Sequence, residues 1–183
     1  MKFTELPLEG SYFIELESFE DNRGAFSRIF CQDEFNKIDH SKNLVQINYS
    51  MTVKKGTVRG MHYQTPPMSE VKIVTCLSGS IYDVIIDLRK GSSTFMHWHG
   101  KTLSGDNKYM LYIPEGFAHG FQALQNNCEL LYFHTEFYNP DFEATINYND
   151  SNIGIEWPLG VTEISEKDKN CPQLPKNFSG III

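Results

Sequence analysis

Short apolar segments that alternate with polar residues dominate the chain up to residue 135. They are rich in aromatic and β-branched residues and are separated by Gly, Pro, Asn or Ser, which is the pattern of strands joined by turns. The expected strands cover residues 11–17, 25–30, 44–50, 56–64, 70–78, 80–89, 93–99, 108–113, 119–124 and 128–135. Their length and spacing predict an all-β sandwich or barrel.

Three regions depart from this pattern. Residues 20–24 have turn composition, and residues 32–39 are compatible with a short helix or a loop. After residue 140 the alternation weakens, which predicts loops with one or two small helices packed across the body. There is no internal repeat, and 183 residues fit one domain, so we expect a single domain over residues 1–183.

Side-chain parity predicts a polar interior. Residues of equal parity in a strand point to the same face. The relevant sets are His62 with Gln64, Lys72 with Val74 and Cys76, and Tyr132 with Leu130 and His134. Lys72 is the single cation in the apolar run 71–77. If these faces point inward, the interior holds a polar cavity suited to chemistry.

Charge and composition narrow the function classes. The net charge of −7 and a pI near 5.3 argue against general nucleic-acid binding, which needs clustered Lys and Arg. An anionic small molecule remains a candidate ligand, because a few convergent cations can bind it whatever the net charge. The candidate cations are Arg23, Arg28, Arg59 and Lys72.

The four cysteines and the chain termini point to a cytoplasmic protein. Cys31, Cys76, Cys128 and Cys171 form no CxxC pair, and buried reduced thiols are the expectation. The first ten residues lack the apolar core of a secretory signal, and no stretch approaches the roughly 18 apolar residues of a membrane span. No membrane partner is therefore expected.

Residues 113–121, IPEGFAHGF, form a strand and a Pro/Gly turn that deliver His119 to the next strand. This stretch resembles the second motif of the cupin superfamily, whose members are small double-sheet jelly rolls. Many cupins bind a metal through a first motif with an HxH pair and a later acid. Here Gln64 replaces the second histidine and Lys72 stands at the acid position, so no metal is expected.

A more specific resemblance extends from about residue 5 to residue 174. The chain is similar to the deoxythymidine-diphosphate-4-dehydrorhamnose (dTDP-4-dehydrorhamnose) 3,5-epimerase family, with blocks in the family's order and spacing. The blocks are Phe19-x-Asp21-x-Arg23-Gly24-x-Phe26, Gln46-x-Asn48-x-Ser50, residues 58–64 with Pro66-Pro67, residues 83–89, residues 113–121, Tyr132 with Phe137-Tyr138, and Ile155-x-Trp157-Pro158. This implies a cupin jelly-roll barrel with short peripheral helices and a C-terminal loop segment.

The resemblance implies cofactor-free epimerisation of a nucleotide-linked 4-keto-6-deoxyhexose. Inverting a carbon next to a ketone needs a base on one face, an acid on the other, and a cation for the enolate oxygen. His62 matches the base and Asp168 its dyad partner; imidazole suits proton abstraction near neutral pH. Lys72 matches the enolate-stabilising residue, and Tyr132 the acid. From sequence alone, Asp168 reads as a solvated loop acid and Tyr132 as a core tyrosine.

The substrate contacts implied by the resemblance form a larger set. Arg59 and His119 match groups near the pyrophosphate and the sugar, and Tyr138 is available to stack on a base or sugar. The remaining nucleotide contacts are Arg23, Phe26, Gln46, Asn48, Glu143 and Lys167. Each of these alone would pass for an ordinary surface residue.

Two residues depart from the family pattern. Arg28 replaces a usual glutamate, and Glu70 replaces a usual glutamine two residues before Lys72. Because arginine only donates hydrogen bonds, we hypothesise that Arg28 alters the nucleotide preference towards CDP- or GDP-linked sugars.

Several alternatives stay open at this stage. The nearest is an enzyme that inverts only C3 or only C5. A non-catalytic nucleotide-sugar-binding cupin is the alternative from another class, and His97 with His99 keeps a metal-dependent cupin oxygenase or isomerase in consideration. The resemblance further implies a homodimer, with N-terminal strands completing the neighbouring sheet, and a role in capsule, lipopolysaccharide or other deoxysugar glycan synthesis, including rhamnose.

Overall fold

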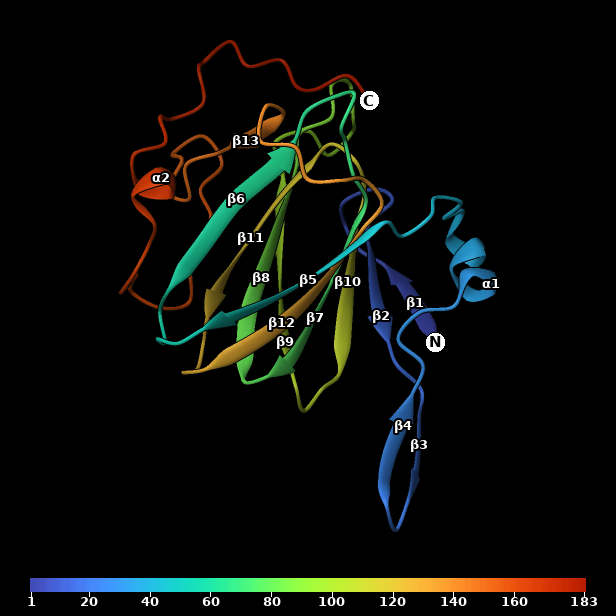
Figure 1. Ribbon diagram of the computed structural model, residues 1–183. Coiled ribbons are helices and arrows are strands. Elements are labelled where there is room, and N and C mark those ends of the chain that lie inside the picture. The colour runs from blue at the N-terminus through green and yellow to red at the C-terminus, as the bar shows by residue number, and fades with distance from the viewer.

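Two antiparallel sheets pack face to face in the computed structural model, which describes residues 1–183 (Figure 1). The six-stranded sheet contains, in spatial order, β1 (Lys2–Glu5), β2 (Tyr12–Glu15), β10 (Tyr109–Ile113), β7 (Lys72–Ser78), β12 (Cys128–His134) and β5 (Gln46–Thr52). The five-stranded sheet contains β13 (Glu143–Thr145), β6 (Val58–Gln64), β11 (Phe117–Ala123), β8 (Ser80–Asp87) and β9 (Trp98–Ser104). The all-β jelly-roll prediction is confirmed.

The space between the sheets is apolar at one end and polar at the other. Val74, Cys76 and Leu130 are at most 2% exposed and belong to the largest hydrophobic cluster, together with Phe121 from the opposite sheet. Burial of this surface is the main force that holds the sheets together. The same strand faces continue into polar side chains, as parity predicts, so the interior changes from core to cavity along each strand.

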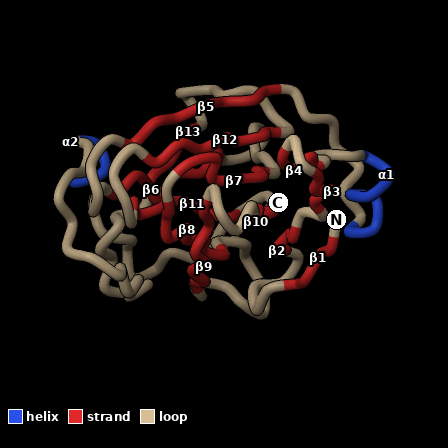
Figure 2. The backbone as a smooth tube through the Cα atoms, turned by 90° about the horizontal axis from the view of Figure 1, so that it is seen from below, coloured by secondary structure: helices blue, strands red, loops and turns tan.

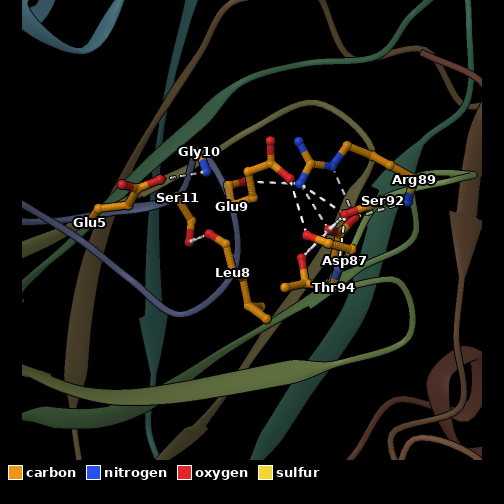
Figure 3. A network of polar contacts seen from close by, with 10 residues as sticks. Glu5, Leu8, Glu9, Gly10, Ser11, Asp87, Arg89, Ser92 and Thr94 are labelled. Atoms are coloured by element: carbon orange, nitrogen blue, oxygen red, sulfur yellow. Dashed lines mark hydrogen bonds and ion pairs between the residues drawn. The ribbon is translucent and has the colours of Figure 1, made fainter.

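One strand is displaced from its expected position. Residues 93–99 were expected to be extended, but β9 starts only at Trp98, because the preceding loop folds around a buried carboxylate (Figure 3). Asp87 is 0% exposed and accepts hydrogen bonds from the side chains of Arg89, Ser92 and Thr94. A buried carboxylate needs such donors, and supplying them requires a compact loop rather than a strand.

Short helices lie at opposite ends of the sandwich (Figure 2). Residues 32–39 form α1 (Gln32–Phe35) and η1 (Asn36–Ile38), which settles the helix-or-loop alternative in favour of helix. Phe35 of α1 is 0% exposed and packs over the outer face of the six-stranded sheet. The second helix, α2 (Glu166–Lys169), lies in the C-terminal segment, where small helices were expected. None of these helices has the length and hydrophobicity of a membrane-crossing segment.

A hairpin protrudes from the body below β2 (Figure 1). It consists of β3 (Ser18–Asp21) and β4 (Gly24–Ser27), which pair only with each other. Phe19 and Phe26 lie opposite one another across the hairpin and are 74% and 71% exposed. The sequence predicted β4 and the turn of this hairpin. It did not predict β3 or β1, nor β13, which lies in the segment where only loops and small helices were expected.

Candidate active site

A cavity of about 570 Å³ opens at the polar end of the interior. Its volume is within the usual range for small-molecule sites. Both sheets and the C-terminal segment contribute to its wall. Among the residues expected from the sequence, those lining it are Asn48, Arg59, His62, Lys72, His119, Tyr132, Tyr138, Glu143 and Asp168.

The five-stranded sheet contributes a histidine–aspartate pair. His62 on β6 donates from Nε2 to Asp168 Oδ1 at 2.7 Å, while the Asp168 side chain is only 4% exposed and that of His62 is 33% exposed. Burial alone would raise the pKa of the Asp168 carboxyl, but the hydrogen bond and charge of His62 hold the pKa below its ordinary value. Asp168 is therefore ionised and fixes the orientation of the imidazole, whose Nδ1 is the remaining nitrogen for chemistry.

A helix cap positions Asp168. The side chain of Ser165 caps α2 by accepting a hydrogen bond from the Asp168 backbone N–H at 3.1 Å. Serine is a preferred residue at this position because its oxygen satisfies a free N–H of the first turn. The Gly60 N–H donates to the second carboxylate oxygen of Asp168 at 3.3 Å. Asp168 is thus held through both its backbone and its carboxylate, although it is far from His62 in sequence.

The six-stranded sheet contributes a tyrosine and a lysine. The Tyr132 hydroxyl shares a 3.1 Å hydrogen bond with the Ser50 hydroxyl on β5. Burial raises the pKa of Tyr132 well above its ordinary value, so the phenol keeps its proton. Lys72 lies on the neighbouring strand β7, with its side chain 12% exposed. A protonated phenol and an ammonium therefore occupy the wall opposite the His62–Asp168 pair.

His119 forms a second histidine–carboxylate pair with a residue that sequence reasoning did not assign. His119 on β11 is the cross-strand partner of His62 and donates to Asp83 Oδ1 at 2.7 Å. Asp83 is 0% exposed, and its other oxygen has no hydrogen-bond partner. The pair fixes the His119 ring beside Tyr132, at a centroid distance of 6.2 Å. The sequence signals for Asp83 are a charge inside an apolar strand and its place at the start of the family block 83–89.

Arg59, Gln46 and Asn48 lie near the rim of the cavity. The exposed Arg59 guanidinium donates to the Thr52 hydroxyl and the Met51 carbonyl, each at 3.1 Å, which holds it at one end of β5. At the other end of that strand, the Gln46 amide donates to Asn48 Oδ1 at 3.2 Å. Polar side chains thus lie at both ends of β5, near the rim of the cavity.

Tyr138, Glu143 and Lys167 meet beside the Gln46 end of β5, where the Tyr138 backbone N–H donates to Gln46 Oε1 at 3.2 Å. The Tyr138 hydroxyl and the Lys167 ammonium both donate to Glu143 Oε2, at 3.0 Å and 2.5 Å. Burial would raise the pKa of Glu143, but these two donors lower it below its ordinary value. Tyr138 as a residue is 55% exposed, so much of its surface is open to a ligand.

Arg23, Phe26 and Arg28 are not brought to the cavity of their own chain. Arg23 and Phe26 lie on the protruding hairpin, and the Arg23 guanidinium is bound to Asp21. Arg28 follows the hairpin and pairs with Glu34 of α1 at 3.0 Å. Within one copy of the chain, Arg28 therefore has no geometric route to choosing the nucleotide.

Sequence reasoning missed two further cavity residues as functional candidates. Glu70 and His134 line the wall next to Lys72 and are joined by a 2.6 Å hydrogen bond. The sequence contains a signal for each residue. His134 shares the face of Tyr132, and Glu70 departs from the family pattern. No cluster of three or more His, Cys, Asp or Glu side chains is placed to hold a metal ion, and His97 and His99 belong to no such cluster.

Comparison with known proteins agrees with the motif resemblance. The family model for dTDP-4-dehydrorhamnose 3,5-epimerase matches residues 5–176. The dTDP-4-dehydrorhamnose 3,5-epimerase of Methanothermobacter thermautotrophicus is 41% identical, over 96% of each chain. The crystal structure of the enzyme of that name from Elizabethkingia anophelis superposes with a TM-score of 0.92 at 36% identity, covering 97% of this chain and 98% of that one.

A third match carries a ligand. The dTDP-6-deoxy-D-glucose-3,5-epimerase of Legionella pneumophila, solved in complex with dTDP-4-keto-L-rhamnose, has a TM-score of 0.87 and 37% identity, with 91% of this chain and 89% of that one covered. Family model, curated relatives and solved structures thus agree over nearly the whole chain. This chain belongs to the dTDP-4-dehydrorhamnose 3,5-epimerase family, whose members are carbohydrate epimerases.

Proposed function

We propose that this protein inverts C3 and C5 of a dTDP-linked 4-keto-6-deoxyhexose without a cofactor. The observation that carries the proposal is the division of groups between the two walls of one cavity. The five-stranded side holds His62 with its ionised partner Asp168, and the six-stranded side holds Tyr132 and Lys72. A sugar ring between these walls has a base on one face and an acid on the other.

The chemistry follows from these positions. His62 removes the proton from the carbon next to the ketone; the C–H electron pair forms a new C=C bond, and the π pair of the C=O bond moves onto the ketone oxygen. The Lys72 ammonium stabilises the resulting enolate. Tyr132 then delivers its proton to the opposite face of the carbon, and solvent restores the protonation states of His62 and Tyr132. The same steps repeated at the second carbon give the 3,5-inverted product, with no change in formula.

The nucleotide is proposed to be deoxythymidine diphosphate. The Legionella relative was solved with a dTDP-linked sugar. The CDP or GDP hypothesis depends on Arg28, which pairs with Glu34 outside the cavity of its own chain and would reach a nucleotide only in the cavity of a second copy. We therefore expect dTDP to bind more tightly than CDP or GDP when the three are compared by isothermal titration calorimetry. Equal affinity for all three would overturn this assignment.

Deuterium incorporation tests the reaction itself. In deuterium oxide the wild-type protein should introduce two deuterium atoms into dTDP-4-dehydro-6-deoxyglucose, one at each inverted carbon, as read by mass spectrometry. One deuterium would identify a C3-only or C5-only epimerase, and binding without incorporation would identify a non-catalytic binder. His62→Ala should lose about 10²–10⁴-fold in exchange rate. Exchange at the wild-type rate in this variant would refute the mechanism.

We further propose that the protein works as a homodimer. Edge strand β5 presents an outward apolar row, and its members Ile47, Tyr49 and Met51 are 59%, 57% and 48% exposed. An exposed edge strand with such a row is a typical place for pairing with a second chain. The β3–β4 hairpin, which includes Phe26 and Arg23, projects away from the body (Figure 1), where a second copy could receive it. The cytoplasmic location and the role in deoxysugar glycan synthesis stay predictions.

A further inference from the structure

A buried carboxylate stands directly beside the enolate-stabilising lysine. Glu70 lies two residues before Lys72, on the same face, and its side chain is 9% exposed. Its oxygen Oε1 is 3.3 Å from the Lys72 ammonium, and no other carboxylate lies within ion-pair distance of that ammonium. An unshared carboxylate in such a position would hold the ammonium by a short, strong hydrogen bond. The carboxylate would then counteract the charge of the Lys72 ammonium more strongly, and fewer of the ammonium N–H groups would be free for a substrate oxygen.

The Glu70 carboxylate is shared, because His134 lies closer to it than Lys72 does. In the pairing of β7 with β12, His134 is the cross-strand neighbour of Lys72. Its Nδ1–H donates to Glu70 Oε2 at 2.6 Å, which is 0.7 Å shorter than the 3.3 Å between Glu70 and Lys72. Burial would raise the pKa of Glu70, but the hydrogen bond from His134, followed by the charge of Lys72, holds the pKa below its ordinary value. The carboxylate is therefore ionised, and its short hydrogen bond goes to His134.

Two more contacts fix the His134 ring in this role. Its Nε2 faces the Asn48 side-chain nitrogen at 3.4 Å, so Nε2 accepts and Nδ1 is the nitrogen that carries the proton towards Glu70. The ring also stacks on Tyr132, with the planes 26° apart and the centroids 6.3 Å apart. The imidazole thus has a defined tautomer and plane.

We propose that Glu70 and His134 form a positioning pair for Lys72: His134 takes the short hydrogen bond of Glu70, and the Lys72 ammonium stays free for the oxygen of the enolate. The Glu70 carboxylate lies 3.3 Å from the ammonium, and its 2.6 Å hydrogen bond with His134 keeps it from forming a short hydrogen bond with Lys72. This inference rests on the proposed function for its catalytic meaning, but the geometry can be tested without it.

The first test is kinetic. His134→Met removes the donor with little loss of volume, and kcat should fall about 10- to 100-fold, as expected when a preorganised charge is weakened. His134→Gln restores an N–H donor and should stay close to the wild-type kcat. Glu70→Gln combined with His134→Met removes the competing charge and should recover most of the lost kcat. His97→Met, on an exposed histidine, is the matched control.

The second test is structural and needs no substrate. In a crystal structure of His134→Met, the Lys72–Glu70 distance should shorten from 3.3 Å to about 2.8 Å, a usual charge-assisted hydrogen bond. An unchanged distance, a wild-type kcat in His134→Met, or a double variant as slow as His134→Met would each overturn the proposal. If the wild-type protein inverts no 4-keto sugar, the proposed function fails, while the distance still decides the role of His134.

Discussion

Tyr132 is the residue whose removal should separate proton abstraction from inversion. In Tyr132→Phe, His62 still removes a proton and can return a solvent deuteron to the same face. We therefore expect deuterium to enter the recovered substrate, while inverted product forms about 10²–10⁴-fold more slowly. Mass spectrometry reports the exchange and proton NMR reports the configuration. Tyr148→Phe, outside the cavity, is the control, and wild-type inversion in Tyr132→Phe would remove this residue from the mechanism.

His40 should make stability depend on pH. It is 2% exposed among Phe30, Phe35 and Tyr112, and burial lowers its pKa below the reference value of 6.5. The unfolded chain therefore binds a proton near pH 6.5 that the folded chain resists, so this residue costs no stability above that pH and an increasing amount below it. Urea unfolding of wild type and His40→Phe at pH 7.5 and pH 5.5 should show a smaller loss in the variant. Equal losses in the two proteins would contradict the assignment.

At the scale of elements, the contact between β6 and β11 depends on two glycines, Gly60 and Gly120, whose backbones lie against each other. A Cβ on Gly120 would lie 2.5 Å from the Met61 sulfur and 2.7 Å from the Arg59 carbonyl oxygen. These strands carry His62 and His119, and their register shifts at this point. Gly120→Ala should lower the free energy of unfolding by about 1–3 kcal/mol, through overpacking, and reduce kcat. Denaturant titration measures the first effect; Gly160→Ala, at a position with open space, should change neither quantity.

What the sequence could predict at this scale follows from local physics. Alternation and turn residues located most strands, and parity correctly placed Lys72 and Tyr132 on interior faces that continue the apolar core. The expected strand at 93–99 was wrong because the loop before β9 folds so that Ser92 and Thr94 donate hydrogen bonds to Asp87. The need for these donors arises from the burial of Asp87 in the folded protein. The His134–Glu70 contact could not be read from the sequence, because it depends on the register between β12 and β7. The place of Asp168 beside His62 came only from family resemblance.

At the scale of the molecule, the hairpin is the part whose position its own chain does not explain. Arg23 and Phe26 match nucleotide contacts of the family, yet they belong to an exposed two-stranded hairpin that pairs with no other strand and projects from the body (Figure 1). A two-stranded hairpin is marginally stable by itself, so packing against another body would stabilise it. The simplest arrangement that satisfies both observations places each hairpin at the cavity of a second copy.

Subunit mixing tests this arrangement. Phe26→Ser should leave folding intact, because the side chain is 71% exposed, but raise the KM for the dTDP-sugar about 3- to 10-fold by removing an aromatic contact. His62→Ala should be inactive with an intact hairpin. If hairpins serve the partner's cavity, a mixed dimer of the two variants contains one cavity with both His62 and a partner Phe26. Co-expressed and refolded mixtures should then recover wild-type KM at a fraction of the wild-type kcat.

Mixtures that keep the high KM of Phe26→Ser would show that the hairpin does not reach a neighbouring cavity, and a monomer in sedimentation velocity would exclude the dimer altogether.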